Sequence, residues 1–170
     1  MKKIIKLAVF LGVICVIASG ALFYANSITA PIITANAKAN TDKLLKEIIK
    51  ADKYEEEAVN EGSISNVYYA YKGDKKIASI YQVETYGFQS EVKVLFAIDD
   101  KGKFISLKTI EQAETPGYGT QIETNKKYLK QFSTKGIDDQ IDTISGSTVT
   151  TAALKTGLDE AVAHFKKENK

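Results

Sequence analysis

A run of hydroxyl-bearing residues near the C-terminus has the composition of a phosphate site. The run reads Asp142-Thr143-Ile144-Ser145-Gly146-Ser147-Thr148. A helical pattern follows it directly, and a helix N-terminus exposes free N–H groups at its positive end, where an anion is stabilised. Because Ser, Gly and Thr are also ordinary capping residues, the run alone is equally typical of a plain helix start. The hydroxyls of Thr150 and Thr151 are expected to contribute no more than such a cap.

A second segment has the residue types of a tight loop beside a flat ligand. It reads Glu114-Thr115-Pro116-Gly117-Tyr118-Gly119. Pro116 restricts one backbone angle, while the two glycines permit a tight turn that brings backbone N–H groups against a ring. Taken alone, the segment is a reverse turn.

The composition limits what chemistry these segments can support. The chain has 170 residues with 23 basic and 21 acidic side chains, for a net charge of +2. This balance gives no argument for a nucleic-acid partner. Every basic residue is lysine, so a phosphate must be held by lysine, hydroxyls or backbone N–H groups rather than by a bidentate arginine.

The metal-binding residues are too few for a metal-based redox site. A single cysteine, Cys15, excludes an internal disulfide and a cysteine-ligated iron–sulfur cluster, and a single histidine, His164, disfavours zinc and haem. No metal site is expected. For a redox protein, an organic cofactor is the remaining candidate.

The first part of the chain predicts a membrane anchor. Residues 7–25 form an almost wholly apolar run, about 28 Å long as a helix at about 1.5 Å per residue. Lys2, Lys3 and Lys6 precede it, which predicts a cytoplasmic N-terminus and an extracytoplasmic remainder. The alternative is a cleaved signal peptide, but its apolar region would be shorter, and the small-x-small site at residues 35–37 lies too far away. We therefore expect an uncleaved anchor.

The pattern after the anchor predicts an α+β domain. Residues after Pro31 and as far as Ala58 have helical spacing, with Glu55, Glu56 and Glu57 as a solvated charge run. Four strands of an antiparallel meander are expected at 67–71, 77–83, 92–98 and 104–110, and helices at 124–132 and 150–167. We expect three parts: 1–26 as cytoplasmic N-terminus and transmembrane anchor, 27–60 as helical connector, and 61–170 as extracytoplasmic domain.

The C-terminal run resembles the flavin-attachment signature of the G subunit of Rnf electron-transport complexes. That family is related to the C subunit of the sodium-pumping NADH:quinone oxidoreductase. The signature has an aspartate, two variable residues, Ser or Thr, Gly, Ala and Thr, matched here by Asp142, Ser145, Gly146 and Thr148, with Ser147 in place of alanine. The resemblance implies that a flavin transferase, using FAD, esterifies Thr148 to the phosphate of FMN.

The loop from Glu114 resembles a Glu-Thr-Pro-Gly-Leu-Gly loop near the flavin ring of the same family, with Tyr118 replacing leucine. The resemblance implies that this loop forms a wall of the flavin site. Glu114 and Thr115 are then candidates for hydrogen bonds to the flavin, and Gly117 and Gly119 for close backbone approach. Tyr86-Gly87-Phe88 matches a further glycine-containing segment of the family only loosely.

The resemblance implies a single N-terminal transmembrane helix followed by an antiparallel-sheet FMN-binding domain flanked by helices. The expected function is electron transfer through covalent FMN in an ion-translocating ferredoxin:NAD oxidoreductase complex, by a redox-carrier subunit with no catalytic centre of its own. The implied partners are the other subunits of a membrane complex, the flavin transferase and the lipid bilayer. Two alternatives remain: a stand-alone membrane-anchored flavoprotein, and an anchored binding module without redox function.

Overall fold

The chain divides into two compact units, residues 1–41 and 42–170. The structure is a computed structural model that describes residues 2–169. Met1 and Lys170, the two ends of the expected three-part division, lie outside the described residues. That division remains a prediction.

Helix α1 (Lys2–Ile48) makes up most of the first unit and ends in the second. Within the described residues it is the one helix long and apolar enough to cross a membrane, with a mean hydropathy of 2.4 over its most apolar window. Pro31 lies inside it, so the apolar segment and the expected connector helix are continuous. The expected helix is too long at its other end, because α1 stops at Ile48 rather than Ala58.

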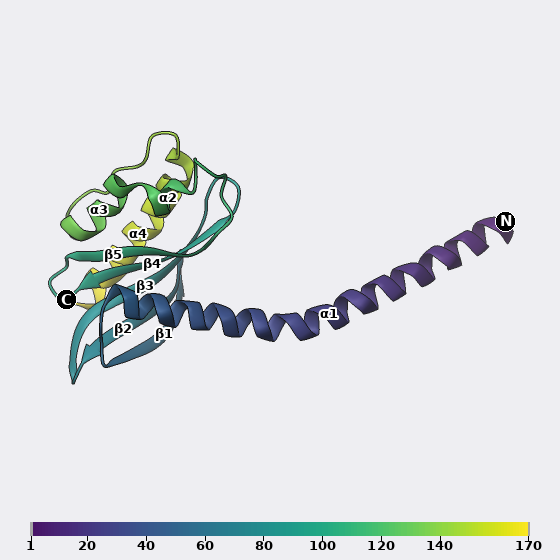
Figure 1. The fold of residues 1–170 in the computed structure, drawn as a ribbon, viewed down its shortest axis with the longest axis horizontal. Helices are drawn as coiled ribbons and strands as arrows, with labels where there is room; N and C mark the ends of the chain where they lie inside the picture. Colours follow the sequence, from purple (N-terminus) through teal and green to yellow (C-terminus); the bar gives the residue numbers. More distant parts are fainter. Residues whose placement is uncertain (1, 170) are drawn as a thin grey trace. The chain divides into compact units, whose positions relative to one another are not determined.

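The second unit is built on one antiparallel sheet whose strands follow chain order, β1-β2-β3-β4-β5 (Figure 1). The strands are β1 (Lys53–Glu61), β2 (Ile64–Lys72), β3 (Lys75–Tyr86), β4 (Glu91–Asp99) and β5 (Phe104–Gln112). The last four contain the four predicted strands. The expected α+β class with an antiparallel sheet is confirmed.

Strand β1 corrects the expected helical reading of residues 53–58. Its three consecutive glutamates, Glu55, Glu56 and Glu57, lie on an edge strand that pairs with β2 and has mostly exposed side chains. Charged side chains are common on sheet edges, where they discourage pairing with another chain. Tyr54 ties the strand to the preceding helix, because its hydroxyl donates a hydrogen bond to the Ile49 carbonyl at 2.5 Å.

Alternating side chains place a hydrophobic layer on each face of the sheet. In β4, Val94 and Phe96 belong to one buried cluster, and Leu95 and Ala97 belong to the other. The first cluster includes residues of α2 (Gln121–Thr124), α3 (Lys126–Thr134) and α4 (Thr148–Glu168). The second includes Leu45 from the last turns of α1. The sheet therefore has helices on both faces, and α4 packs against the first face through residues from Leu154 onward.

Candidate functional site

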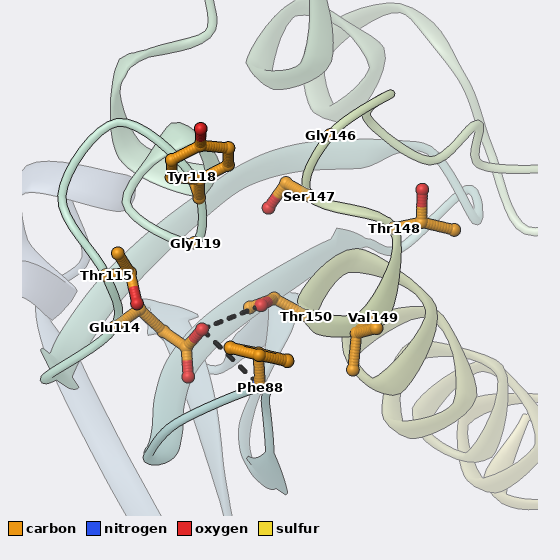
Figure 2. Close-up of a pocket in the computed structure, with 10 residues that line it drawn as sticks. All are labelled: Phe88, Glu114, Thr115, Tyr118, Gly119, Gly146, Ser147, Thr148, Val149 and Thr150. Carbon is orange, nitrogen blue, oxygen red and sulfur yellow. Dashed lines mark hydrogen bonds between the residues drawn. The ribbon is translucent and has the colours of Figure 1, made fainter.

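A pocket of about 480 Å³ lies where three segments distant in sequence meet. The segments are the β3–β4 connection, the loop that follows β5, and the start of α4 (Figure 2). We call this cavity the α4 pocket. It is lined by Phe88, Glu114, Thr115, Tyr118, Gly119, Gly146, Ser147, Thr148, Val149 and Thr150. Its size and its largely apolar lining, with a few polar groups, are those of a small-molecule site.

Glu114 joins all three segments through its carboxylate. Oε1 accepts hydrogen bonds from the backbone N–H groups of Gln89, at 3.0 Å, and Ser90, at 2.9 Å. Oε2 accepts from the Phe88 N–H at 3.3 Å and from the Thr150 hydroxyl at 2.8 Å (Figure 2). Both oxygens of this buried carboxylate are therefore engaged by the protein.

The carboxyl of Glu114 is held ionised by these hydrogen bonds. Burial favours the neutral form, but the donated bonds from Gln89, Ser90, Thr150 and Phe88 outweigh burial and hold the pKa of Glu114 below its ordinary value of 4.5. The expected hydrogen bond from Glu114 to a flavin stays a prediction, because Glu114 also lines the α4 pocket. In this structure the side chain positions the walls of the pocket.

Two glycines make room for this carboxylate. A Cβ atom added at Gly119 would collide with the Glu114 side chain, and one added at Gly87 would lie 2.6 Å from Oε1. Both glycines therefore pack closely against Glu114, and the approach of Gly119 to a flavin stays a prediction. Gly117 does not line the α4 pocket; it has a positive φ of 80°, and its N–H donates to the Thr120 hydroxyl at 2.9 Å.

Thr115 lines the α4 pocket, and its hydroxyl already forms a hydrogen bond within the chain. Its hydroxyl donates to the Gln89 side-chain oxygen at 2.7 Å, which adds a second tie between the loop after β5 and the β3–β4 connection. A hydroxyl can still accept a hydrogen bond while donating one. The Thr115 side chain therefore retains capacity for a ligand.

The start of α4 brings four hydroxyl groups together, and only one is exposed. Ser147, Thr150 and Thr151 are 5%, 1% and 1% exposed, whereas Thr148 is an exposed residue. Thr148 is the first residue of α4, and its hydroxyl lies 3.4 Å from the Ile144 carbonyl. Gly146, with a φ of 84°, shapes the turn before it, a backbone conformation that glycine adopts without strain.

The other two residues of the predicted attachment segment lie on the far side of this turn. Asp142 and Ser145 line a separate hollow beside α3. Asp142 forms an ion pair with Lys135 at 2.9 Å, and its N–H donates to the Gln131 side chain at 2.9 Å. The structure therefore brings Gly146, Ser147 and Thr148 to the α4 pocket, while Asp142 fastens the segment to α3.

Phe88, Val149 and Thr150 are pocket residues that sequence reasoning did not assign to the site. Phe88 is 70% exposed and Val149 56% exposed, and with Tyr118, at 62%, they form an apolar rim. Exposed large apolar residues gathered at a cavity mark a binding surface. The sequence pattern that could have assigned Phe88 to the site was Tyr86-Gly87-Phe88, which matches a segment of the Rnf G-subunit family only loosely.

Comparison with known proteins supports a flavin-related assignment. Residues 87–163 match the family described as the FMN-binding domain. This stretch contains every residue that lines the α4 pocket.

Several curated proteins are similar over most of the chain. The G subunit of the ion-translocating oxidoreductase complex of Haemophilus influenzae is 27% identical over 169 residues, covering 85% of this chain and 80% of the relative. The protein of the same name from Stutzerimonas stutzeri is 22% identical, covering 91% and 78%.

A third relative matches over a shorter stretch. The G subunit of the proton-translocating ferredoxin:NAD(+) oxidoreductase complex of Clostridium ljungdahlii is 30% identical over 106 residues, covering 56% of this chain and 57% of the relative. Together these matches confirm the resemblance to G subunits of ion-translocating oxidoreductase complexes.

Proposed function

We propose that this chain is an electron-transfer subunit of a membrane-bound ion-translocating ferredoxin:NAD oxidoreductase complex, and that it carries FMN covalently attached to Thr148. The choice of Thr148 as the attachment site is supported by the difference in solvent exposure among the four hydroxyls at the start of α4. A modifying enzyme needs access to its acceptor, and Thr148 is exposed where Ser147, Thr150 and Thr151 are buried.

The residues of the α4 pocket fit FMN. Phe88 and Tyr118 provide exposed aromatic side chains suited to a flat ring, and the cavity is lined mainly by apolar atoms. No lysine lines the cavity among the described residues, so the phosphate charge would be met by backbone N–H groups at the start of α4. When bound, FMN supplies reversible electron transfer, while the protein supplies binding and orientation.

In the proposed attachment reaction, FAD is the co-reactant that supplies the FMN group. An oxygen–phosphorus bond forms between Thr148 Oγ1 and the FMN phosphorus, and the pyrophosphate bond to AMP breaks. AMP leaves with the electron pair of that bond, and the proton of the hydroxyl passes to a base of the transferase or to water. The chain contributes the hydroxyl and the turn at Gly146. Asp142 helps to hold the segment in position through its ion pair with Lys135.

Purification of the full chain after coexpression with a flavin transferase tests this function. We expect flavin fluorescence that survives denaturing electrophoresis and a mass higher by one FMN less one water. The other subunits of the complex should copurify from native membranes. A dark wild-type band beside a fluorescent positive-control substrate would contradict the flavin assignment. A fluorescent chain that copurifies with no other membrane protein would favour a stand-alone flavoprotein.

The proposed topology makes a separate prediction. Because α1 is long and apolar and Lys2, Lys3 and Lys6 precede its apolar part, we expect an uncleaved anchor with the second unit outside the cytoplasm. Protease added to intact protoplasts should remove a C-terminal epitope tag, while a cytoplasmic marker stays intact. Replacing the three lysines with glutamine should reduce the digested fraction. Protection of the wild-type tag until lysis would contradict the orientation.

A further inference from the structure

The Ser147 hydroxyl is a buried polar group without a hydrogen-bond partner. Four side-chain polar atoms share this state among the described residues, namely Ser79 Oγ, Thr85 Oγ1, Tyr128 Oη and Ser147 Oγ. Of the four, Ser147 alone lines the α4 pocket. A buried hydroxyl without a partner costs free energy, because it has lost water and gained nothing in exchange.

Ser147 stands at the N-cap of α4 but does not act as a cap. A serine at this position ordinarily accepts a hydrogen bond from an N–H group in the first turn. Here the backbone has φ −128° and ψ 28°, and the side chain makes no capping hydrogen bond. The N–H of Ser147 donates to the Ile144 carbonyl at 3.0 Å, and its own carbonyl accepts from the Thr151 hydroxyl at 2.8 Å. Both backbone groups of Ser147 thus form hydrogen bonds, and its side-chain hydroxyl is the one group of this residue without a partner.

The two adjacent hydroxyls of the attachment segment point in different directions. In Figure 2 the Ser147 side chain points toward the space between Tyr118 and Thr150, while the Thr148 hydroxyl lies on the other side of the backbone. A group attached at Thr148 and a group bonded to Ser147 would therefore occupy different parts of the pocket. In the proposed attachment the phosphate is bonded to Thr148, so Ser147 would contact the remainder of the ligand.

We propose that Ser147 Oγ is a hydrogen-bonding position for the ribityl–isoalloxazine part of the flavin, separate from the phosphate linkage. This inference rests on the proposed function, because it requires a flavin in the α4 pocket. Both parts of that ligand carry hydroxyl, carbonyl or ring nitrogen atoms that a serine hydroxyl can pair with. Ser147 is then a positioning residue.

The test compares stability with and without flavin in three full-length chains: wild type, Ser147→Ala and Ser79→Ala. Ser79 is the matched control, because its hydroxyl is also buried and unpartnered but lies in β3, away from the pocket lining. Flavin-free chains come from cells lacking the transferase, and loaded chains from coexpression. Urea unfolding in detergent gives the folding equilibrium constant of each form.

We expect Ser147→Ala to leave the flavin-free protein as stable as wild type, or more stable, because it removes an unpaired hydroxyl. In the loaded protein it should lower stability, reducing the flavin-induced gain in the folding equilibrium constant by about two- to tenfold. Ser79→Ala should leave that gain unchanged. The Ser147→Ala chain should remain fluorescent, since the resembled signature has alanine at this position.

Three results would overturn the inference. One is an equal flavin-induced gain in wild type and Ser147→Ala. Another is loss of covalent flavin from Ser147→Ala alone, which would assign the hydroxyl to recognition by the transferase. The third is a reduced flavin-induced gain in the folding equilibrium constant of Ser79→Ala as well. The effect would then not be specific to Ser147. Failure of the proposed function is distinct, because the wild-type chain would then carry no flavin.

Discussion

Replacing Thr148 with alanine is expected to abolish covalent flavin, leaving fluorescence in a denaturing gel at background. The substitution removes the one exposed hydroxyl at the start of α4, while Ser147, Thr150 and Thr151 stay buried. Folding should be little affected, by about 0.5 kcal/mol or less, because Thr148 is a surface residue whose described side-chain bond is a long one of 3.4 Å to Ile144. In-gel fluorescence and intact mass after coexpression with the transferase make the measurement.

The structure also selects the controls for this experiment. Thr150 and Thr151 are poor controls, since their buried hydroxyls bond to Glu114 and to the Ser147 carbonyl, and their loss would disturb the pocket. Thr143→Ala removes an exposed hydroxyl from the same segment and should retain flavin. Thr148→Ser keeps a hydroxyl at the acceptor position and should restore at least part of the signal. Fluorescent Thr148→Ala protein would show that another residue is the acceptor.

Replacing Glu114 with alanine is expected to have the largest effect on stability, lowering the free energy of unfolding by about 2–4 kcal/mol. The change leaves the N–H groups of Phe88, Gln89 and Ser90 and the Thr150 hydroxyl without their acceptor. Urea unfolding of the full chain in detergent measures the loss. Glu111→Ala is the matched control, because Glu111 is an exposed glutamate three residues away. Its effect should stay within about 0.5 kcal/mol.

Acid should weaken the same contact in the unmutated protein. The pKa of Glu114 is lower in the folded protein than its ordinary 4.5, so the folded state favours the ionised carboxylate. This contribution is complete above the unfolded-state pKa and is lost as the pH falls through the folded-state pKa. Stability of wild type should therefore fall more steeply below pH 4.5 than that of Glu114→Gln, which has no such proton to bind. If the stabilities of the two chains fell equally with decreasing pH, protonation of Glu114 would be excluded as the cause of the acid destabilisation.

Local patterns were sufficient to predict the elements that depend on hydrophobic periodicity. The apolar run of residues 7–25, the four strands later observed in β2 to β5, and the helix at the C-terminus all carry a signal within a short window. Strand β1 has no such signal. Its glutamates face solvent on an edge strand, so it is defined by pairing with β2 and by Tyr54 reaching the end of α1.

The amino-acid sequence by itself determined which residues could carry the chemistry. The single cysteine and the single histidine left an organic cofactor as the candidate for redox chemistry, and the segment around Gly146 had the residue types of a phosphate site, while the linkage at Thr148 was implied by the family resemblance. These are properties of residue type and order, which do not depend on how distant segments pack.

Only the tertiary structure decided what each of these residues contacts. Glu114 lines the α4 pocket, and its carboxylate accepts hydrogen bonds from backbone N–H groups of residues 88–90 and from Thr150, which lies 36 residues further along the chain. The same packing buries Ser147 and leaves Thr148 exposed. Burial and hydrogen-bond partners arise from segments distant in sequence, and a local pattern carries no information about which of two adjacent hydroxyls will face a pocket.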